Sequence, residues 1–159
     1  MSSRMSPEAL DAWQRLHTVT EALQRQLARG LRDDAGLSGA EFTVLAHLVA
    51  AGGSARPADC ARSISWEPSR LTHQLGRLEA RGYLERAAGS GGGRRTEVTL
   101  TAAGRAAHRA AVGPHLRAAK HWFADALDET QLHALDDALR AVEQRLATAD
   151  QPTSEEDPA

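Results

Sequence analysis

Two groups of cationic and hydrogen-bonding side chains in this sequence have the chemistry to bind a polyanion. The first is the pair Arg94 and Arg95, which directly follows a glycine-rich run in the segment ERAAGSGGGRRTEVTLT. The second lies in SWEPSRLTHQLGRLEARG, where a helical wheel of about 100° per residue places five residues on one face, none of them acidic. That face comprises Trp66, Ser69, Arg70, His73 and Arg77. Guanidinium, hydroxyl and imidazole groups bind phosphates and base edges, so both groups indicate nucleic-acid chemistry.

The charge distribution points in the same direction. The 159-residue chain has a formal net charge of −2, yet residues 62–95 contain seven arginines and three glutamates, whereas residues 125–159 contain ten acids and two arginines. A basic middle within a nearly neutral chain indicates a polyanion-binding face on part of the fold. The alternative is that these arginines merely solvate a helix, and charge alone does not decide between the two.

Residue spacing gives little support to other chemistry. The sequence has no glycine-flanked serine, no phosphate-binding glycine loop before a helix and no obvious pair of catalytic carboxylates, so we expect neither an enzyme nor a cofactor. The seven histidines include no His-x-x-x-His pair, whereas zinc needs three or four converging ligands, so we expect no metal site. Cys60, the single cysteine, is interpreted as a small buried residue rather than a redox centre.

Length and hydropathy indicate a single soluble domain. No apolar run approaches the roughly 20 residues needed to span a bilayer. The N-terminal residues MSSRMSPEALDAWQ lack the apolar segment of a signal peptide. We therefore expect a cytoplasmic protein without a membrane partner.

Apolar periodicity and capping residues predict four helices in the first half of the chain. Residues 7–31 form a long helix after Ser6, with an apolar stripe that starts at Trp13, and Gly36 ends the pattern. A second helix follows Ser38, which forms a capping box with Glu41. Its expected buried face comprises Phe42, Leu45, Leu48 and Val49. A short third helix follows Pro57, and the fourth buries Leu71, Leu75 and Leu78, which share one helical face.

A hairpin and two further helices complete the chain. Residues 83–88 and 96–100 are expected to be two strands that flank the glycine run. Thr101 is the expected N-cap of a long alanine-rich helix, in which Gly113-Pro114 should produce a kink or a local break. The last helix repeats apolar residues at spacings of 3 and 4, close to a heptad seam. These residues are Leu132, Leu135, Leu139, Val142 and Leu146.

This order of elements predicts a mainly α fold with a small β-hairpin wing. Residues 38–101 form a winged helix-turn-helix lobe, and the helices at about 7–31 and 102–147 flank it within one domain of residues 1–147. The acidic stretch 148–159 is expected to be a disordered tail. A recognition helix in a major groove reads base edges, and a thin cationic wing reaches an adjacent minor groove. A solvated hairpin that contacts nothing is the alternative for the wing.

Three stretches resemble the multiple-antibiotic-resistance regulator (MarR) family of bacterial winged-helix repressors. They are LSGAEFTVLAHLVAAGG, SRLTHQLGRLEARGYLER and RRTEVTLTAAGR, and the similarity runs from about residue 8 to residue 147. The family's wing usually carries Asp-x-Arg near its tip; here the arginine is Arg94, whereas Gly92 replaces the aspartate. The resemblance implies a homodimer that assembles through the terminal helices, binds a palindromic double-stranded operator and represses transcription.

The resemblance also implies where DNA and an effector would bind. The expected contacts of the recognition helix are Ser69, Arg70, Thr72, His73, Gln74 and Arg77, and those of the wing are Ser90, Arg94 and Arg95. In relatives a small aromatic or amphipathic effector binds between the DNA-binding lobe and the dimer helices. Residues expected near such a pocket are Trp13, His17, His47 and Trp66. Two alternatives remain open: a winged-helix module that binds proteins, and a metal- or redox-sensing member of the same family.

Overall fold

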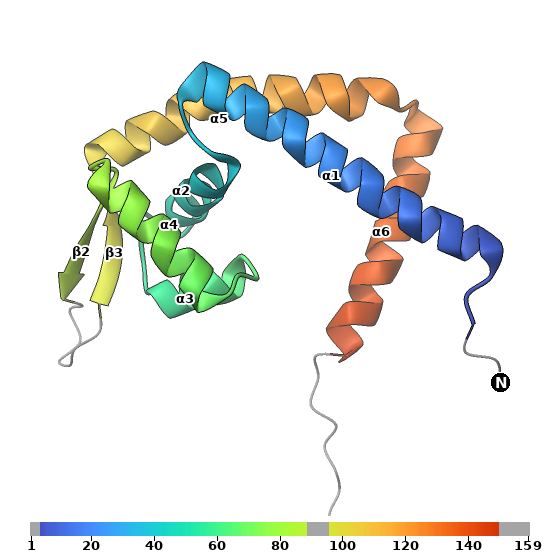
Figure 1. The fold of residues 1–159 in the computed structure, drawn as a ribbon, viewed down its shortest axis with the longest axis horizontal. Helices are drawn as coiled ribbons and strands as arrows, with labels where there is room; N and C mark the ends of the chain where they lie inside the picture. Colours follow the sequence, from blue (N-terminus) through green and yellow to red (C-terminus); the bar gives the residue numbers. More distant parts are fainter. Residues whose placement is uncertain (1–3, 89–95, 150–159) are drawn as a thin grey trace, which may run out of the picture. The chain divides into compact units, whose positions relative to one another are not determined.

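The computed structural model describes residues 4–88 and 96–149, which fall into two compact units with the division between Ala119 and Lys120. Figure 1 shows the elements in chain order. The first unit begins with α1 (Pro7–Ala35), α2 (Gly39–Ala50), β1 (Ser54–Ala55), α3 (Pro57–Ser63) and α4 (Pro68–Ala80). It continues with β2 (Leu84–Ala88), β3 (Thr96–Leu100) and α5 (Ala102–Trp122), and the chain then forms the 3₁₀ turn η1 (Ala124–Ala126) and α6 (Glu129–Ala149).

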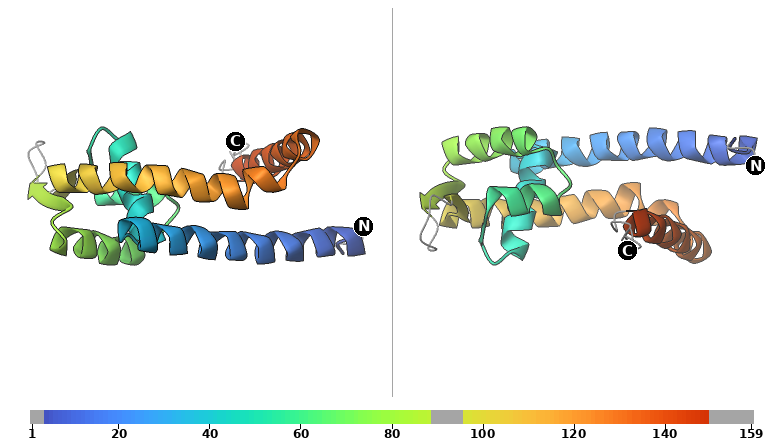
Figure 2. Two further views of the ribbon diagram at one scale, coloured as in Figure 1. Left: turned by 90° about the horizontal axis from the view of Figure 1, so that it is seen from above. Right: turned by 90° about the horizontal axis from the view of Figure 1, so that it is seen from below.

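Helix α1 begins and ends where its capping residues predict. The side chain of Ser6 accepts a hydrogen bond from the backbone of Ala9, and Pro7 occupies the first helical turn. Gly36 ends the helix in the left-handed conformation, at φ 62°, which costs glycine little. The helix is four residues longer than expected, and only its C-terminal end reaches the core, through Leu31. Figure 2 shows its N-terminal half extending beyond α2, α3 and α4.

The core of the first unit is formed by leucines from α2 and α4 together with strand residues. Leu71, Leu75 and Leu78 are all at most 1 % exposed, which confirms the apolar face expected for α4. In α2 the expected face was partly wrong, because Val49 is exposed and Phe42 is only partly buried, whereas Val44 is fully buried. The buried positions 41, 44, 45 and 48 are separated by three, one and three residues, which places them on one helical stripe. The buried Cys60 of α3 contributes to this core, as expected.

The sheet has three antiparallel strands in the order β1-β3-β2, whereas the sequence predicted two. The expected hairpin is present, with Leu84 opposite Leu100 and Ala88 opposite Thr96. The additional strand pairs Ser54 with Thr99. A two-residue strand has no alternation that periodicity can detect, so it forms only because β3 offers a free edge.

Helix α5 is held to the sheet by its N-cap. The hydroxyl of Thr101 accepts a hydrogen bond from the backbone of Gly104 at 3.0 Å and donates one to the carbonyl of Gly82 at 2.7 Å. The local break expected at Pro114 is absent, because α5 continues from Ala102 to Trp122. Proline removes only one backbone donor, and tertiary packing on the N-terminal side, where Ala111 is fully buried, favours a continuous helix.

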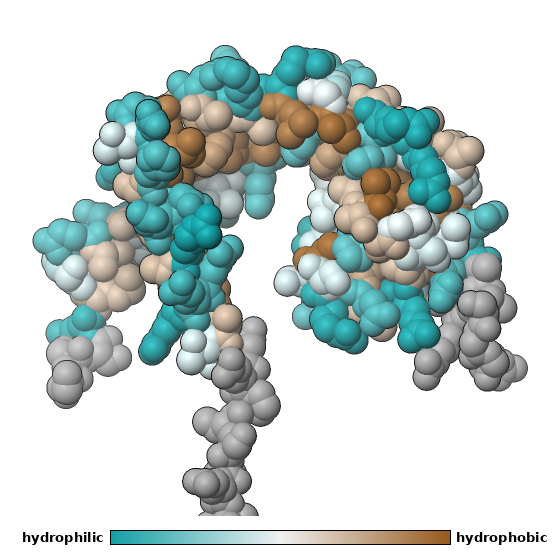
Figure 3. All heavy atoms as spheres, turned by 180° about the vertical axis from the view of Figure 1, so that it is seen from behind, coloured by the Kyte–Doolittle hydropathy of each residue, from teal (hydrophilic) through white to brown (hydrophobic). Residues whose placement is uncertain are grey.

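Helix α6 belongs to the second unit. Asp128 and Gln131 form a reciprocal cap at its start, with bonds of 2.8 and 3.0 Å. The helix ends at Ala149, two residues beyond the expected boundary, and residues 150–159 lie outside the described part of the chain. Its heptad-like positions Leu132, Leu139, Val142 and Leu146 are 40–61 % exposed in this single chain. Figure 3 shows hydrophobic residues at the surface of the molecule among the hydrophilic ones. No helix among the described residues is long and apolar enough to cross a membrane.

Candidate nucleic-acid interface

The candidate interface is built on α4, whose start is set by Pro68. Pro68 occupies the first turn, and a residue before proline disfavours the helical conformation, so Glu67 is extended. Trp66 therefore precedes α4 and does not belong to its outer face, which corrects the helical-wheel assignment. Ser65 adopts φ 53°, the one positive value among the described non-glycine residues, and the backbone of Trp66 bonds to Ala61 at 2.9 Å. This turn directs the indole of Trp66 against the core.

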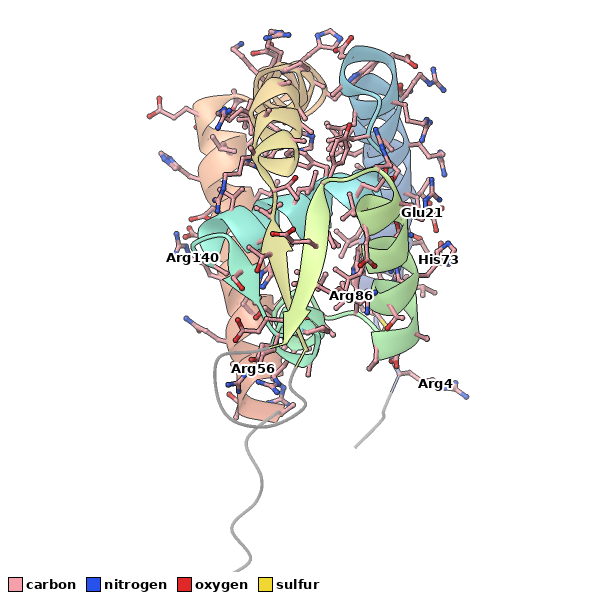
Figure 4. All side chains as sticks on the ribbon, turned by 90° about the vertical axis from the view of Figure 1, so that its left-hand side faces the viewer. Arg4, Glu21, Arg56, His73, Arg86 and Arg140 are labelled. Atoms are coloured by element: carbon pink, nitrogen blue, oxygen red, sulfur yellow. The ribbon has the colours of Figure 1, made fainter. Side chains whose placement is uncertain are left out.

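The side chains expected to meet DNA are largely exposed on α4. The exposed residues are Ser69, Arg70, Thr72, His73 and Arg77. Figure 4 shows His73 on the outer side of this helix. The hydroxyl of Thr72 donates to the carbonyl of Pro68 at 2.8 Å and retains lone pairs as an acceptor. Gln74 differs from the others, because it is half-buried and its Oε1 atom has no hydrogen-bond partner.

Arg77 is drawn toward a buried carboxylate on α2. Its Nε atom lies 3.9 Å from Oε1 of Glu41, and Nη1 of Arg81 lies 3.2 Å from the same oxygen. These are ion-pair distances, although Oε1 has no partner in the directional geometry of a hydrogen bond. Burial opposes ionisation of Glu41, but hydrogen bonds from Ser38 and the charge of Arg81 outweigh it, so the pKa of this carboxyl is lowered.

The hairpin is tied to α4 by a second ion pair. Nε of Arg86 in β2 donates to Glu79 in α4 at 3.1 Å, and Figure 4 shows Arg86 pointing from the strand toward this helix. The register of β2 with β3 leaves residues 89–95 as the connection between the strands. The expected wing contacts Ser90, Arg94 and Arg95 are in this connection and lie outside the described residues.

A cleft of about 680 Å³ opens beside α4 within the first unit. Its walls come from the C-terminal half of α1, the N-terminal half of α2, the turn before α4 and the middle of α5. Arg70 reaches this cleft as well as the outer face of α4, and its guanidinium lies 4.0 Å from the ring centroid of Trp66. Of the four residues expected around an effector, Trp66 lines the cleft, whereas Trp13, His17 and His47 do not.

Two histidines of α5 pack on the aromatic wall of this cleft. The ring of Phe42 lies 4.6 Å from that of His115 and 5.5 Å from that of His108, measured between centroids. Burial lowers the pKa of both histidines, and Nδ1 of His115 is buried without a partner. Trp13 and His17 instead contact each other on the exposed part of α1, with ring centroids 4.3 Å apart.

Comparison with solved structures finds proteins with the same arrangement of helices and wing. AbsC, a MarR family transcriptional regulator from Streptomyces coelicolor, has a TM-score of 0.82 and 26 % identity, covering 92 % of this chain and 99 % of its own. Sco3205, a MarR family regulator from the same organism solved in complex with DNA, has a TM-score of 0.82 and 25 % identity, covering 96 % and 97 %. This chain has the winged-helix fold of MarR family transcriptional regulators and resembles them over most of its length. No protein-family model matches the sequence, and no curated protein is significantly similar to it.

The MarR fold also relates this chain to more distant structures. A mutant of MarR from E.coli, complexed with operator DNA, has a TM-score of 0.74 and 23 % identity, covering 88 % of this chain and 99 % of its own. At this identity the likeness concerns the fold. AbsC and Sco3205 are described as transcriptional regulators and not as enzymes.

The metal- and redox-sensing alternatives receive no support from the described residues. No group of three or more potential ligands there is arranged to hold a metal ion. The thiol of Cys60 is fully buried, and burial raises its pKa, which keeps it in the less reactive protonated form.

The sequence did not predict two parts of this candidate site. Periodicity gave no indication that Glu41 reaches Arg77 of α4 and Arg81, which follows that helix, because the capping box already explained an acid at position 41. His115 was considered only as a metal ligand, whereas it lines the cleft with Phe42. A single apolar or imidazole side chain on an alanine-rich helix carries no pattern that reveals its partner.

Proposed function

We propose that this chain is a sequence-specific DNA-binding transcriptional regulator, a repressor that binds an inverted-repeat operator as a homodimer. The observation that carries the proposal is the exposed face of α4. Ser69, Arg70, Thr72, His73 and Arg77 present donors and cations to solvent, while three leucines fix the opposite face in the core. A helix anchored in this way has the rigidity and the exposed chemistry that reading base edges requires.

Relatives with the same fold support this proposal. Sco3205 and the MarR mutant from E.coli were both solved with DNA. In this chain the expected wing arginines directly precede β3 in sequence, β3 pairs with β2, and the ion pair between Arg86 and Glu79 joins β2 to α4. The wing and the recognition helix would therefore meet DNA as one structural unit.

Exposed apolar side chains on two long helices support a dimer. Trp13 and Leu16 on α1 are about half exposed, as are Leu139 and Val142 on α6. Burial of such side chains against a second copy is favourable, and a two-fold assembly places two recognition helices about one DNA turn, ~34 Å, apart.

Light scattering at micromolar concentration tests the dimer and should give twice the chain mass of 17.0 kDa. Replacing Val142 and Leu146 with Asp should yield monomers that retain their helices. A monomeric mass for the unaltered chain would contradict the proposed dimer.

We further propose that a small aromatic or amphipathic effector occupies the cleft and releases the DNA. The cleft combines apolar walls with the indole of Trp66, the imidazole of His115 and the guanidinium of Arg70. The organohalide-sensing regulator RdhR-CbdbA1625, with 20 % identity and a TM-score of 0.80, was solved in a 2,4-dichlorophenol bound form. An effector that binds Arg70 would draw its guanidinium away from the DNA-facing side of α4. Binding in the cleft would thereby weaken the contact between Arg70 and DNA.

Selection of bound sequences from a random DNA pool tests the main proposal. The expected result is an enriched inverted repeat whose affinity falls steeply with salt, because phosphate contacts release counterions. Absence of a mobility shift at any salt concentration would favour a module that binds proteins instead.

The effector is tested on the enriched DNA. Small phenols and aromatic acids should release it from the unaltered chain, and Ala46→Leu, which fills the cleft, should abolish release while DNA binding persists. Release that is equally strong from the Ala46→Leu variant would place the effector elsewhere.

A further inference from the structure

Among the described residues, Glu41 is the one buried side chain that carries a charge, with 2 % of its surface exposed. A buried carboxylate is unfavourable unless hydrogen bonds and opposite charges compensate it. A capping box explains one of its two oxygens: Oε2 accepts from the backbone N–H of Ser38 at 2.8 Å. Glutamine performs the same capping role, so capping alone does not require a charge here.

The second oxygen joins α2 to α4. Oε1 lies 3.2 Å from Nη1 of Arg81 and 3.9 Å from Nε of Arg77. Arg81 is in turn held by Tyr83, whose hydroxyl accepts from Nη2 at 3.1 Å and whose ring centroid lies 4.6 Å from Cζ. One carboxylate thereby connects the start of α2, the C-terminal half of α4 and the start of the hairpin.

Arg77 occupies a special place in this cluster. Its side chain is 55 % exposed on the face of α4 that is proposed to meet DNA, while its Nε atom faces the Glu41 carboxylate. An arginine held on one side presents its remaining donors in a restricted set of directions, because the planar guanidinium turns as a unit. An arginine without such a partner could bind phosphates in many positions and would discriminate poorly between bases.

We propose that Glu41 is a positioning residue for DNA recognition, which fixes α4 against α2 and sets the direction in which Arg77 meets the bases. This inference rests on the proposed DNA-binding function. Glu41 itself is buried and does not touch DNA. Its effect on binding passes through Arg77 and Arg81, and it concerns selectivity between sequences more than total affinity.

Simple electrostatics makes the opposite prediction, which gives a sharp test. Removing an acid from a DNA-binding surface should, by charge alone, tighten binding to any sequence. Asp59→Asn serves as the matched control, since Asp59 of α3 is also paired with an arginine, Arg62, at 3.3 Å, but is exposed. Ser38→Ala is a second control, because it removes the hydroxyl that caps α2 and leaves the carboxylate of Glu41 in place.

The experiment measures the affinity of the full chain for its selected DNA and for random DNA at one salt concentration, beside a thermal melt. Glu41→Gln should lower the ratio of selected to random affinity by roughly tenfold, the lower part of the range for one lost base contact. Asp59→Asn should leave that ratio unchanged. Ser38→Ala should lower the melting temperature and also leave the affinity ratio unchanged.

A double-mutant cycle identifies Arg77 as the intermediary. In an Arg77→Ala background, Glu41→Gln should cause no further loss of the ratio. An unchanged ratio in the single Glu41→Gln variant, or an equal loss in both backgrounds, overturns the inference. If the unaltered chain selects no DNA at all, the proposed function fails first. If Glu41→Gln does not fold, Glu41→Asp, which retains the charge on a shorter side chain, is measured in its place, with the same two outcomes applied to it.

Discussion

The guanidinium of Arg70 lies 4.0 Å from the ring centroid of Trp66, so one cation belongs both to the exposed face of α4 and to the wall of the adjacent cleft. A cation over an indole is stabilised by the negative face of the ring. Trp66 itself is directed to this place by the turn at Ser65, whose positive φ is unusual for a residue with a side chain. The pair therefore couples the geometry of the cleft to a residue proposed to contact DNA.

Arg70→Ala should weaken binding to the selected DNA by about 1–3 kcal/mol, the range for a lost base contact. It should also expose the indole of Trp66, because the guanidinium that covers it is gone. Fluorescence of a Trp13→Phe, Trp122→Phe background, in which Trp66 is the only tryptophan, should then shift to longer wavelength. An unshifted spectrum would show that Arg70 does not cover Trp66 in solution.

His73→Ala should weaken binding to selected DNA by about 1–3 kcal/mol and relax the sequence preference, because His73 is exposed at the middle of α4. Affinities for selected and random DNA, measured by fluorescence anisotropy, give the comparison. Equal losses on both would mean that this imidazole contacts phosphate only.

Replacing both Arg94 and Arg95 with alanine should weaken DNA binding strongly and leave the melting temperature nearly unchanged. The two arginines follow a glycine-rich run that offers no apolar side chain to a core. Each lost phosphate or minor-groove contact should reduce the salt slope by about one unit. Binding isotherms at two salt concentrations measure this slope, and an unchanged isotherm would rule out a DNA-binding wing.

Gly104→Ala should destabilise the fold, because an added Cβ atom would meet the backbone oxygen of Tyr83 at 2.0 Å. Overpacking of this kind costs about 1–3 kcal/mol or more. Gly76→Ala is the matched change in α4, where a Cβ meets nothing within 4 Å. It should stabilise the helix by about 0.5–1 kcal/mol. Chemical denaturation of both variants checks the opposite signs, and two changes of the same sign would contradict the packing described here.

Stability should fall as the pH drops below about 6.5, the ordinary pKa of histidine. Burial lowers the pKa of His108 and His115 in the folded chain, so the unfolded chain binds protons first. Their contribution to stability is therefore complete above about pH 6.5 and declines as the pH falls toward the lowered values. Thermal melts at several pH values measure this decline. A His108→Gln, His115→Gln variant should show a flatter profile, and a profile as steep as that of the unaltered chain would assign the decline to other groups.

Local sequence determined most of the helical architecture. Ser6, Ser38 and Thr101 cap α1, α2 and α5 as their residue types and positions indicate, and the spacing of Leu71, Leu75 and Leu78 fixed the buried side of α4. The polar side of α4 followed as the complement of that buried side. These features were predictable because capping and helical periodicity act over at most a few residues.

The tertiary structure decided what depends on pairing between distant segments. Whether Glu41 meets Arg81, forty positions later, depends on how α2 packs on α4, and no local pattern encodes that contact. The same holds for β1, a two-residue strand that exists only because β3 lies beside it, and for His115, which reaches the cleft through the course of α5. Such contacts arise when packed helices and strands bring together side chains that the sequence keeps apart, and they turn a polar helix face into a positioned site.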